Sequence, residues 1–254
     1  MARSNSSRRV GLARALSKLG HCSRSEARKL IRAGRVRLNR RLRFDPETPV
    51  HLEKDCVEVD GQRLSEETRI YLMLNKPRGL VTTASDEEGR ETIYSCLSDN
   101  LPWVAPVGRL DKASEGLLLL TNDSEWGARM LAPETHLDKT YHVQMGALVD
   151  SGLIHAILAG VKAGNGDVLQ AKAARILREG KRNTWLEIVL DEGKNRHIRR
   201  MFEALGAEVL RLVRVAVGPL VLGNLPKRAF RSLTATEKQA LDRAMNPSAK
   251  SQAH

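Results

Sequence analysis

Hydrophobic residues near the start of the chain recur at the spacing of two short helices. Leucines fall on one helical face within residues 10–19, and Gly20 is a residue type that commonly ends a helix. A second helix is predicted between Ser23 and Gly34, because Ser23 and Glu26 have the spacing of a capping box. Basic side chains occupy the face of this helix that its apolar residues leave free. The pattern therefore predicts a pair of helices with one basic surface.

Two short strands are expected next, at residues 36–38 and 57–59, and an Asp60–Gly61 turn follows the second. The first strand runs into the turn sequence Asn-Arg-Arg at residues 39–41, which lacks a glycine for a left-handed position. Together with the helices, these strands predict a small N-terminal α/β domain.

The remainder of the chain contains more strand patterns than helical patterns. Strand patterns occur at residues 70–74, 140–145, 168–176 and 185–190, and helical patterns occur at residues 124–131, 150–158 and 196–205. The unbroken apolar run Leu117–Leu120 fits a strand that is buried on both faces. Because the strands mostly follow one another, we expect an α+β domain with a mostly antiparallel sheet.

These patterns predict a division of the chain into two domains, a linker and two tails. In chain order, the predicted parts are a disordered basic tail over residues 1–9, the small domain over 10–64, a polar linker over 65–69, the larger domain over 70–245 and a disordered tail over 246–254.

The net charge of +12 is concentrated at the N-terminus. Residues 1–43 contain 14 Lys and Arg residues and a single acidic residue, whereas the remaining 211 residues contain 28 basic and 29 acidic residues. A basic module attached to a nearly neutral body is typical of a protein that binds a polyanion. Nucleic acid is the first candidate for that polyanion, and an anionic membrane is the second.

The spacing of cysteines and histidines indicates neither a disulfide framework nor a structural metal site. Cys22, Cys56 and Cys96 lack C-x-x-C spacing, which favours a reducing compartment, and the histidines do not pair at metal-ligand spacing. No apolar run approaches the roughly 18 residues that cross a bilayer. The Arg- and Ser-rich N-terminus also fits a mitochondrial transit peptide, but residues 10–20 are needed for the first domain. We therefore expect a cytoplasmic protein.

Asp111 is the residue whose position most strongly suggests chemistry. It lies between Leu110 and a Ser-Glu-Gly turn, and the apolar run 117–120 follows that turn. At the edge of a rigid, dry sheet an ionised carboxylate costs several kcal/mol unless it is paired, and that cost commonly marks a functional site. An Asp that only caps a turn is the alternative, and it is the one that spacing alone favours.

Residues 108–123 read Gly-Arg-Leu-Asp-Lys-Ala-Ser-Glu-Gly-Leu-Leu-Leu-Leu-Thr-Asn-Asp, which resembles the catalytic motif of pseudouridine synthases. The branch that it resembles is named for RsuA, and its members modify ribosomal RNA. Further matches follow in the expected order at residues 139–143 and 192–201. The first domain resembles the small RNA-binding domain of the S-four type, named after a ribosomal small-subunit protein. The resemblance implies the pseudouridine synthase fold for the larger domain.

The resemblance also implies a reaction that needs no cofactor and no metal ion. The bond between ribose C1′ and uracil N1 breaks, the base rotates, and uracil C5 forms the new bond to C1′. This reaction requires an ionised carboxylate, a cation that keeps it ionised, a pocket for the free uracil and a group that replaces the flipped nucleotide in the stack. The implied partner is ribosomal RNA or a pre-ribosomal particle, and a monomer is the default.

The resemblance assigns roles to several motif residues. Asp111 either attacks C1′ or assists loss of the 2′ proton, while Glu115 is interpreted as a turn or sheet-end group. Tyr141 would place its ring against the flipped base, although a half-buried strand tyrosine is the alternative. Arg109 lies two residues before Asp111 and would point to the same side of an extended segment, where it could fill the gap in the stack. Ile198 would line the uracil pocket.

Lys194 is the cation that the resemblance implies, because family members carry Arg or Lys after the glycine of this motif. A phosphate-binding or plain surface role is the alternative for Lys194. His197 stands where the family commonly has Gln, and no role is assigned to it. Asn75 and Lys76 begin a loop that contains Pro and Gly and would lie near the cleft, but an equally reasonable interpretation is a structural turn.

The basic surface of the first domain is expected to contact RNA. Its predicted contact residues are Arg24, Arg28, Lys29, Arg32, Arg35 and Arg37. A solvated surface is the alternative, but such surfaces usually mix charges of both signs. Because Phe44 is the only aromatic residue of this module, phosphate and shape contacts should dominate over base stacking. In the larger domain, Arg196, Arg199 and Arg200 recur at helical spacing and are expected to face RNA or acidic groups.

Three functions are compatible with these features. The first is an RNA-modifying isomerase that acts through Asp111. The second is a catalytically inactive RNA-binding ribosome-assembly factor, which would be favoured if Tyr141 and Lys194 lay far from Asp111. The third is a membrane-surface protein, but the basic helices retain core residues and carry no aromatic anchor.

Overall fold

The computed structural model describes residues 9–65, 68–84, 86–98 and 100–246, and the chain divides into two compact units. Unit 1 comprises Met1–Tyr71, Ser98–Ala105 and Leu120–Glu125, and unit 2 comprises Leu72–Leu97, Pro106–Leu119 and Trp126–His254. Apart from Arg9 and Asn246, both predicted tails lie outside the described residues.

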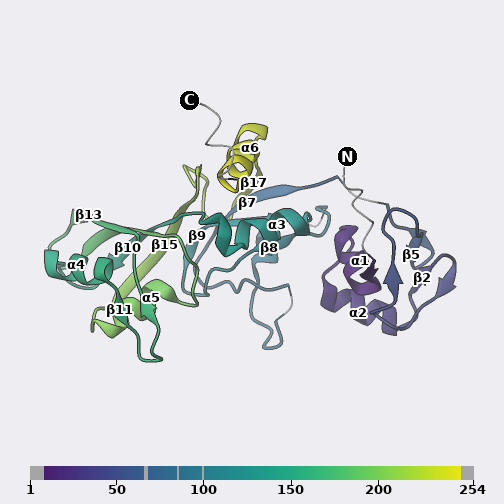
Figure 1. The fold of residues 1–254 in the computed structure, drawn as a ribbon, viewed down its shortest axis with the longest axis horizontal. Coiled ribbons are helices and arrows are strands. Elements are labelled where there is room, and N and C mark those ends of the chain that lie inside the picture. The colour runs from purple at the N-terminus through teal and green to yellow at the C-terminus, as the bar shows by residue number, and fades with distance from the viewer. Residues whose placement is uncertain (1–8, 66–67, 85, 99, 247–254) are drawn as a thin grey trace, which may run out of the picture. The chain divides into compact units, whose positions relative to one another are not determined.

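The N-terminal module contains two helices and a small sheet. Its elements are β1 (Val10–Gly11), α1 (Leu12–Lys18), α2 (Arg24–Arg32), β2 (Val36–Leu38), β3 (Arg41–Leu42), β4 (Pro49–Val50), β5 (Val57–Val59) and β6 (Gln62–Arg63) (Figure 1). Both predicted helices are confirmed, and the Ser23 side chain caps α2 by accepting a hydrogen bond from the backbone of Glu26. Buried residues of both helices and of β2 and β5 form one core, so the basic face of α2 is left outside it.

The hairpin between β2 and β3 forms without glycine. Asn39 and Arg40 both adopt left-handed backbone conformations, with φ of 52° and 69°. These are the conformations that a two-residue hairpin turn requires, and a non-glycine residue pays roughly 1–2 kcal/mol for each. The Asn39 side chain offsets part of this cost, because it donates to Asp55 and accepts from the backbone of Cys56.

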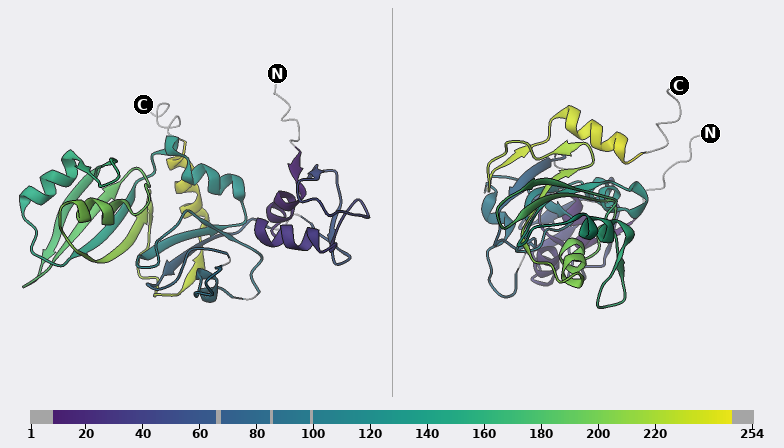
Figure 2. Two further views of the ribbon diagram at one scale, coloured as in Figure 1. Left: turned by 90° about the horizontal axis from the view of Figure 1, so that it is seen from below. Right: turned by 90° about the vertical axis from the view of Figure 1, so that its left-hand side faces the viewer.

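Unit 2 is built on a nine-stranded sheet. Its elements, of which a few residues fall in unit 1, are β7 (Tyr71–Lys76), β8 (Ala105–Val107), β9 (Glu115–Thr121), α3 (Ser124–Leu131), β10 (Lys139–Met145), α4 (Ser151–Ala159), β11 (Val161–Lys162), β12 (Val168–Leu169), β13 (Ala173–Glu179), β14 (Thr184–Leu190), α5 (His197–Ala204), β15 (Val209–Val217), β16 (Leu220–Val221), β17 (Phe230–Ser232) and α6 (Ala235–Ala244), with 3-10 helices at Ile93–Cys96 and Pro133–Thr135. The strand order is β13-β14-β10-β15-β9-β7-β17, and β8 and β16 pair at its side. Strand twist along this sheet is visible in the two views of Figure 2.

The predicted α+β class with a mostly antiparallel sheet is confirmed. β13–β14, β14–β10, β10–β15 and β7–β17 pair antiparallel, whereas β15 and β9 are parallel. Helices α4 and α5 pack on one face of β10, β14 and β15 and enclose a core with Val143, Ile157, Ile188 and Phe202.

Two predicted elements have different limits in the structure. The strand predicted at residues 70–74 continues to Lys76, so Asn75 and Lys76 belong to a strand and not to a loop. The strand predicted at 168–176 is two strands, β12 and β13, that belong to different sheets. Between these strands the backbone of Ala171 bonds to Ile157 of α4, which directs the chain out of the first pairing before the second begins.

Strand β9 is buried at every position, as the apolar run predicted. Its Gly116 has φ of 101° and lies opposite Arg214 of β15, and a Cβ atom there would be 2.2 Å from the Arg214 carbonyl oxygen. This close approach connects the segment after Asp111 to β15.

We therefore expect Gly116→Ala to destabilise unit 2 by about 3 kcal/mol or more, because it adds both a steric clash and an unfavourable φ. The measurement is the urea midpoint followed by circular dichroism. Gly164→Ala is the matched control, since a Cβ there meets no atom within 4 Å. A midpoint for Gly116→Ala equal to that of the control would contradict this account of the strand pair.

Candidate active site

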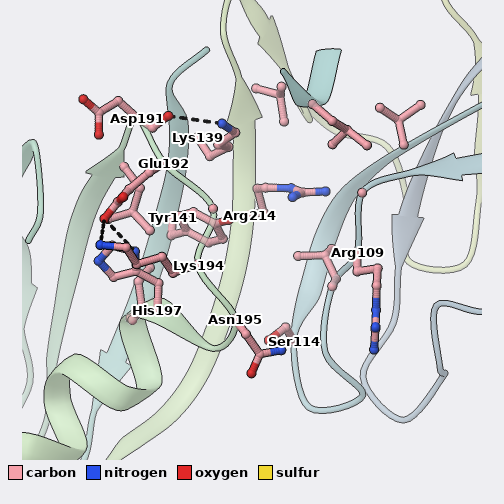
Figure 3. Close-up of a pocket in the computed structure, with 18 of the residues that line it drawn as sticks. Arg109, Ser114, Lys139, Tyr141, Asp191, Glu192, Lys194, Asn195, His197 and Arg214 are labelled. Atoms are coloured by element: carbon pink, nitrogen blue, oxygen red, sulfur yellow. Dashed lines mark hydrogen bonds and ion pairs between the residues drawn. The ribbon is translucent and has the colours of Figure 1, made fainter. Parts of the chain in front are cut away.

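A cavity of about 800 Å³ opens in unit 2, and its size is typical of a small-molecule or nucleotide pocket. Its walls come from the Asp111 segment, the turn before β10, one face of β10 and β15, and the loop that leads into α5 (Figure 3). Five of the predicted site residues line it, namely Arg109, Asp111, Tyr141, Lys194 and Ile198. The structure thus brings together three segments that are widely separated in the sequence.

Asp111 lies in an irregular segment whose backbone is fixed by neighbouring groups. The Thr82 hydroxyl donates to the carbonyl oxygen of Leu110 at 2.7 Å, and the amide of Gly79 donates to that of Lys112 at 2.8 Å. The Ser114 amide closes a turn on the Asp111 carbonyl oxygen. Among the described residues, no side chain forms a hydrogen bond or ion pair with the half-buried Asp111 carboxylate, so its oxygens remain available to a substrate.

Lys76 lies directly beneath the Asp111 turn. Its side chain is fully buried, and its ammonium donates to the carbonyl oxygens of Pro77, Asp111 and Ser114 at 2.8–3.1 Å. Burial lowers the pKa of Lys76 to about 8, and the negative charges of Asp111 and Glu115 oppose this shift. Lys76 was predicted to lie in a loop near the cleft, and that prediction is wrong. Lys76 is a strand residue that fixes the backbone of the Asp111 turn.

Asn75 also proves to be a structural residue of this strand. It is buried, and its side chain donates to the carbonyl oxygen of Leu225 at 2.7 Å. Because the side chain is already engaged in this way, Asn75 anchors the strand, and it is not part of the cavity wall.

Arg199 of α5 is a second cation near Asp111. Its guanidinium donates to the carbonyl oxygens of Ala113 and Val209, both at 3.2 Å. Burial lowers the pKa of Arg199, the charge of Arg196 lowers it further, and the Asp111 carboxylate acts in the opposite direction. The sequence predicted that Arg199 faces RNA or acidic groups, and it did not predict that the side chain is partly buried beside Asp111. The overlooked signal is its position beside Ile198 and three residues before Phe202, since both of these belong to the core.

Lys194 lines the cavity, but its charge has other partners. The ammonium pairs with Glu192 at 3.0 Å and donates to the carbonyl oxygen of Val168 at 3.1 Å. Glu192 also lies 3.7 Å from the buried ring of His197, whose pKa is lowered mainly by burial. Figure 3 shows these three side chains as one cluster. Lys76 and Arg199 therefore bind carbonyl oxygens of the Asp111 turn, and Asp111 acts on the pKa of both, whereas the charge of Lys194 is engaged by Glu192.

The remaining predicted cavity residues take distinct positions. Tyr141 on β10 is half-buried, packs against the core and faces the cavity. Ile198 is almost fully buried at the start of α5. Figure 3 shows Arg109 on the opposite side of the cavity from Tyr141. Among the described residues, the exposed Arg109 guanidinium has no hydrogen-bond or ion-pair partner.

Glu115 is a sheet residue and not a second catalytic acid. Its carboxylate is buried and pairs with Arg211 at 2.7 Å and Lys227 at 2.8 Å. Burial opposes its ionisation, but the hydrogen bonds from Arg211 and Lys227 lower its pKa. The interpretation of Glu115 as a structural group thus agrees with its contacts.

The predicted RNA-binding residues of the N-terminal module are all exposed; these are Arg24, Arg28, Lys29, Arg32, Arg35 and Arg37. Three of them have acidic neighbours, because Arg28 pairs with Glu47, Lys29 with Glu26 and Arg35 with Asp60. Glu47 and Asp60 come from later in the chain and are brought to the basic face by folding. The face is therefore less purely basic than residues 1–43 suggest.

Neither a metal site nor a membrane span is found in the part of the chain that the structure describes. No group of three or more His, Cys, Asp or Glu side chains there could hold a metal ion. None of the helices there is long and apolar enough to cross a bilayer.

A cavity with the Asp111 carboxylate on its wall, in a chain that also carries an exposed basic helical module, fits an enzyme that acts on RNA. Residues 70–204 match the family described as RNA pseudouridylate synthase, and residues 10–56 match the S4 domain. The chain therefore belongs to the RNA pseudouridylate synthase family and carries an N-terminal S4 domain. Both resemblances seen in the sequence motifs are confirmed.

Individual relatives cover nearly the whole chain. The "Ribosomal large subunit pseudouridine synthase B" of Bacillus subtilis is 33% identical over 231 residues, which are 91% of this chain and 94% of that protein. An "Uncharacterized RNA pseudouridine synthase" of Aquifex aeolicus is 37% identical over 231 residues, covering 91% and 92%. A solved structure described as a pseudouridylate synthase superposes with a TM-score of 0.63 at 30% identity and covers 91% of this chain and 99% of that one.

Proposed function

We propose that this protein isomerises a specific uridine of ribosomal RNA to pseudouridine, with Asp111 as the catalytic carboxylate. The observation that carries the proposal is the unpaired Asp111 carboxylate on the wall of a nucleotide-sized cavity. The name of the Bacillus relative supports ribosomal RNA as the substrate and makes large-subunit RNA the first place to search. We expect the protein to act in the cytoplasm as a monomer, on ribosomal RNA or a pre-ribosomal particle, without a cofactor.

The reaction conserves every atom of the nucleotide. When the C1′–N1 bond breaks, its electron pair stays on uracil, and Asp111 either bonds to C1′ or accepts the 2′ proton. After the base rotates, C5 bonds to C1′ as the Asp111–C1′ bond breaks, or, on the other route, as the proton returns from Asp111 to C2′. The C5 proton then leaves and N1 gains a proton. The protein therefore has to keep one carboxylate ionised and confine an anionic base, which its own side chains can do.

We assign the supporting cations to Arg199 and Lys76. Both interact electrostatically with Asp111, and both fix carbonyl oxygens of its turn. A positive charge beside a carboxylate favours the ionised form. Tyr141 and Ile198 would confine the base, and Arg109 would replace the flipped nucleotide in the stack. The exposed basic residues of α2 would bind the RNA backbone.

This assignment predicts different effects for substitutions at Arg199 and Lys194. We expect Arg199→Met to lower kcat by about 10²-fold, because Asp111 loses a neighbouring charge and its turn loses a donor. Lys194→Met should change kcat less than about threefold, because its charge is engaged by Glu192. Single-turnover rates with saturating enzyme would measure both. A larger loss of kcat for Lys194→Met than for Arg199→Met would show that Lys194, and not Arg199, is the cation that supports Asp111.

The experiment that tests the function maps pseudouridines on ribosomal RNA from cells with and without this chain. One pseudouridine should disappear with the gene, return with the wild-type protein and stay absent with Asp111→Asn. An unchanged map would favour the inactive assembly factor. A pseudouridine restored by Asp111→Asn would refute Asp111 as the catalytic group.

A further inference from the structure

Arg214 is a buried cation that projects from β15 into the cavity (Figure 3). Only 7% of this residue is exposed, and its Nε donates to the carbonyl oxygen of Leu117 on β9 at 2.8 Å. In the described part of the chain, its two terminal nitrogens have no hydrogen-bond or ion-pair partner. The hydrogen bond to β9 uses one of the five N–H donors of the guanidinium, and a purely structural role does not explain the other four.

Lys139 adds a second positive charge to the same wall. It is half-buried, lines the cavity and donates to the Asp191 carbonyl oxygen at 3.4 Å. Burial lowers the pKa of Lys139, the charge of Arg214 lowers it further, and Asp138 and Asp191 oppose the shift. Among the described residues, neither Lys139 nor Arg214 has a carboxylate within the 4.0 Å of an ion pair. The cavity also contains the carboxylates of Asp111, Asp191 and Glu192, but because neither cation forms an ion pair with them, both can meet an anionic or strongly polar ligand.

The position of this cation pair indicates which part of the nucleotide it meets. Arg214 lies directly opposite Tyr141 in the β10–β15 ladder, and Lys139 lies two residues before Tyr141 on the same strand. Both cations therefore lie on the same face of the sheet as Tyr141, whose ring is predicted to contact the flipped base. Apolar side chains of Leu119, Leu212 and Val217 line the same cavity, so the electrostatic interactions there are poorly screened. A flat base suits this wall better than a hydrated phosphate.

We propose that Arg214, supported by Lys139, binds a carbonyl oxygen of the flipped uracil and stabilises the negative charge that the base carries once the C1′–N1 bond has broken. The electron pair of that bond is shared between N1 and the ring carbonyl oxygens, and N–H donors already in place stabilise such a charge. A guanidinium can only donate hydrogen bonds, so it suits the O4 oxygen of uracil and not the amino group of cytosine. This inference rests on the proposed function and adds base recognition to it.

The experiment compares single-turnover rates of wild type, Arg214→Met and Arg214→Lys on a short RNA that carries the mapped uridine. Arg214→Met should lower the rate by about 10²-fold or more, Arg214→Lys by less, and the RNA Kd should stay within about threefold. Arg178→Met is the control, since Arg178 stacks on Trp185 outside the cavity lining. Thermal melting establishes that each variant is folded. Should Arg214→Met fail to fold, Lys139→Met takes its place, with an expected loss of about tenfold.

A second substrate separates charge stabilisation from a purely structural role. With 5-fluorouridine at the target position, the departing base is a weaker base and needs less stabilisation. The ratio of wild-type to Arg214→Met rates for breaking the C1′–N1 bond should then narrow by about tenfold. An unchanged ratio, a wild-type rate for Arg214→Met, or a loss confined to Kd with a smaller salt dependence would each overturn the proposal, the last in favour of a phosphate contact. Absence of turnover by the wild type would instead count against the proposed function.

Discussion

Asp111→Asn is expected to abolish pseudouridine formation, with kcat at least about 10³-fold below wild type, while folding and RNA affinity stay near wild type. Asparagine has the same shape but neither the negative charge nor the nucleophilicity of the carboxylate. The Asp111 side chain has no hydrogen-bond or ion-pair partner in the described part of the chain. Lys76 and Arg199 bind backbone carbonyls of its turn, which the substitution leaves in place. The loss should therefore be catalytic and not structural.

The measurement is the amount of pseudouridine formed in a single turnover, together with a thermal melt and an RNA-binding curve. Asp150→Asn is the matched control, because Asp150 caps α4 outside the cavity and asparagine caps a helix equally well. Turnover by Asp111→Asn within tenfold of this control would exclude Asp111 as the catalytic group. A lowered melting temperature would show instead that the carboxylate stabilises the fold.

The second large effect concerns RNA binding by α2. Replacing Arg24, Arg28, Lys29 and Arg32 together with glutamine should weaken RNA binding by about 10³-fold, because each lost phosphate contact contributes roughly 1 kcal/mol. The slope of log affinity against log salt should become shallower by about 3, because the variant neutralises four fewer phosphates and so releases fewer counterions when it binds. All four side chains are exposed, and glutamine favours helix, so the module should remain folded.

A control with the same net charge distinguishes a binding surface from a general charge effect. Glutamine at Lys162, Arg178, Lys181 and Arg182 also removes four exposed charges, but from unit 2. Fluorescence anisotropy across a potassium chloride series measures both variants. Equal losses for the two variants would mean that net charge and not the α2 surface determines affinity, and an unchanged salt slope for the α2 variant would remove α2 from the RNA interface.

The elements that the sequence predicted best are those with strong local signals. The capped helix α2 and the fully apolar strand β9 appear where residue spacing and composition place them. Strand β15 was not predicted, because its arginines interrupt the apolar alternation that marks a half-buried strand. One of those arginines, Arg214, is buried only because β9 and β10 lie on either side of it.

The sequence by itself determined which carboxylate to examine, the family of the chain and the concentration of positive charge at one end. It could not determine which cations lie near Asp111, because a sequence does not show whether a given Lys or Arg side chain faces water or a cavity. That choice depends on pairings between distant segments, such as Gly116 opposite Arg214, and on the burial of Lys76 under the Asp111 turn. The electrostatic energy of each cation is set by burial and distance. Only the tertiary structure fixes both quantities, and it therefore selects Arg199 and Lys76 as neighbours of Asp111 and leaves Lys194 with Glu192.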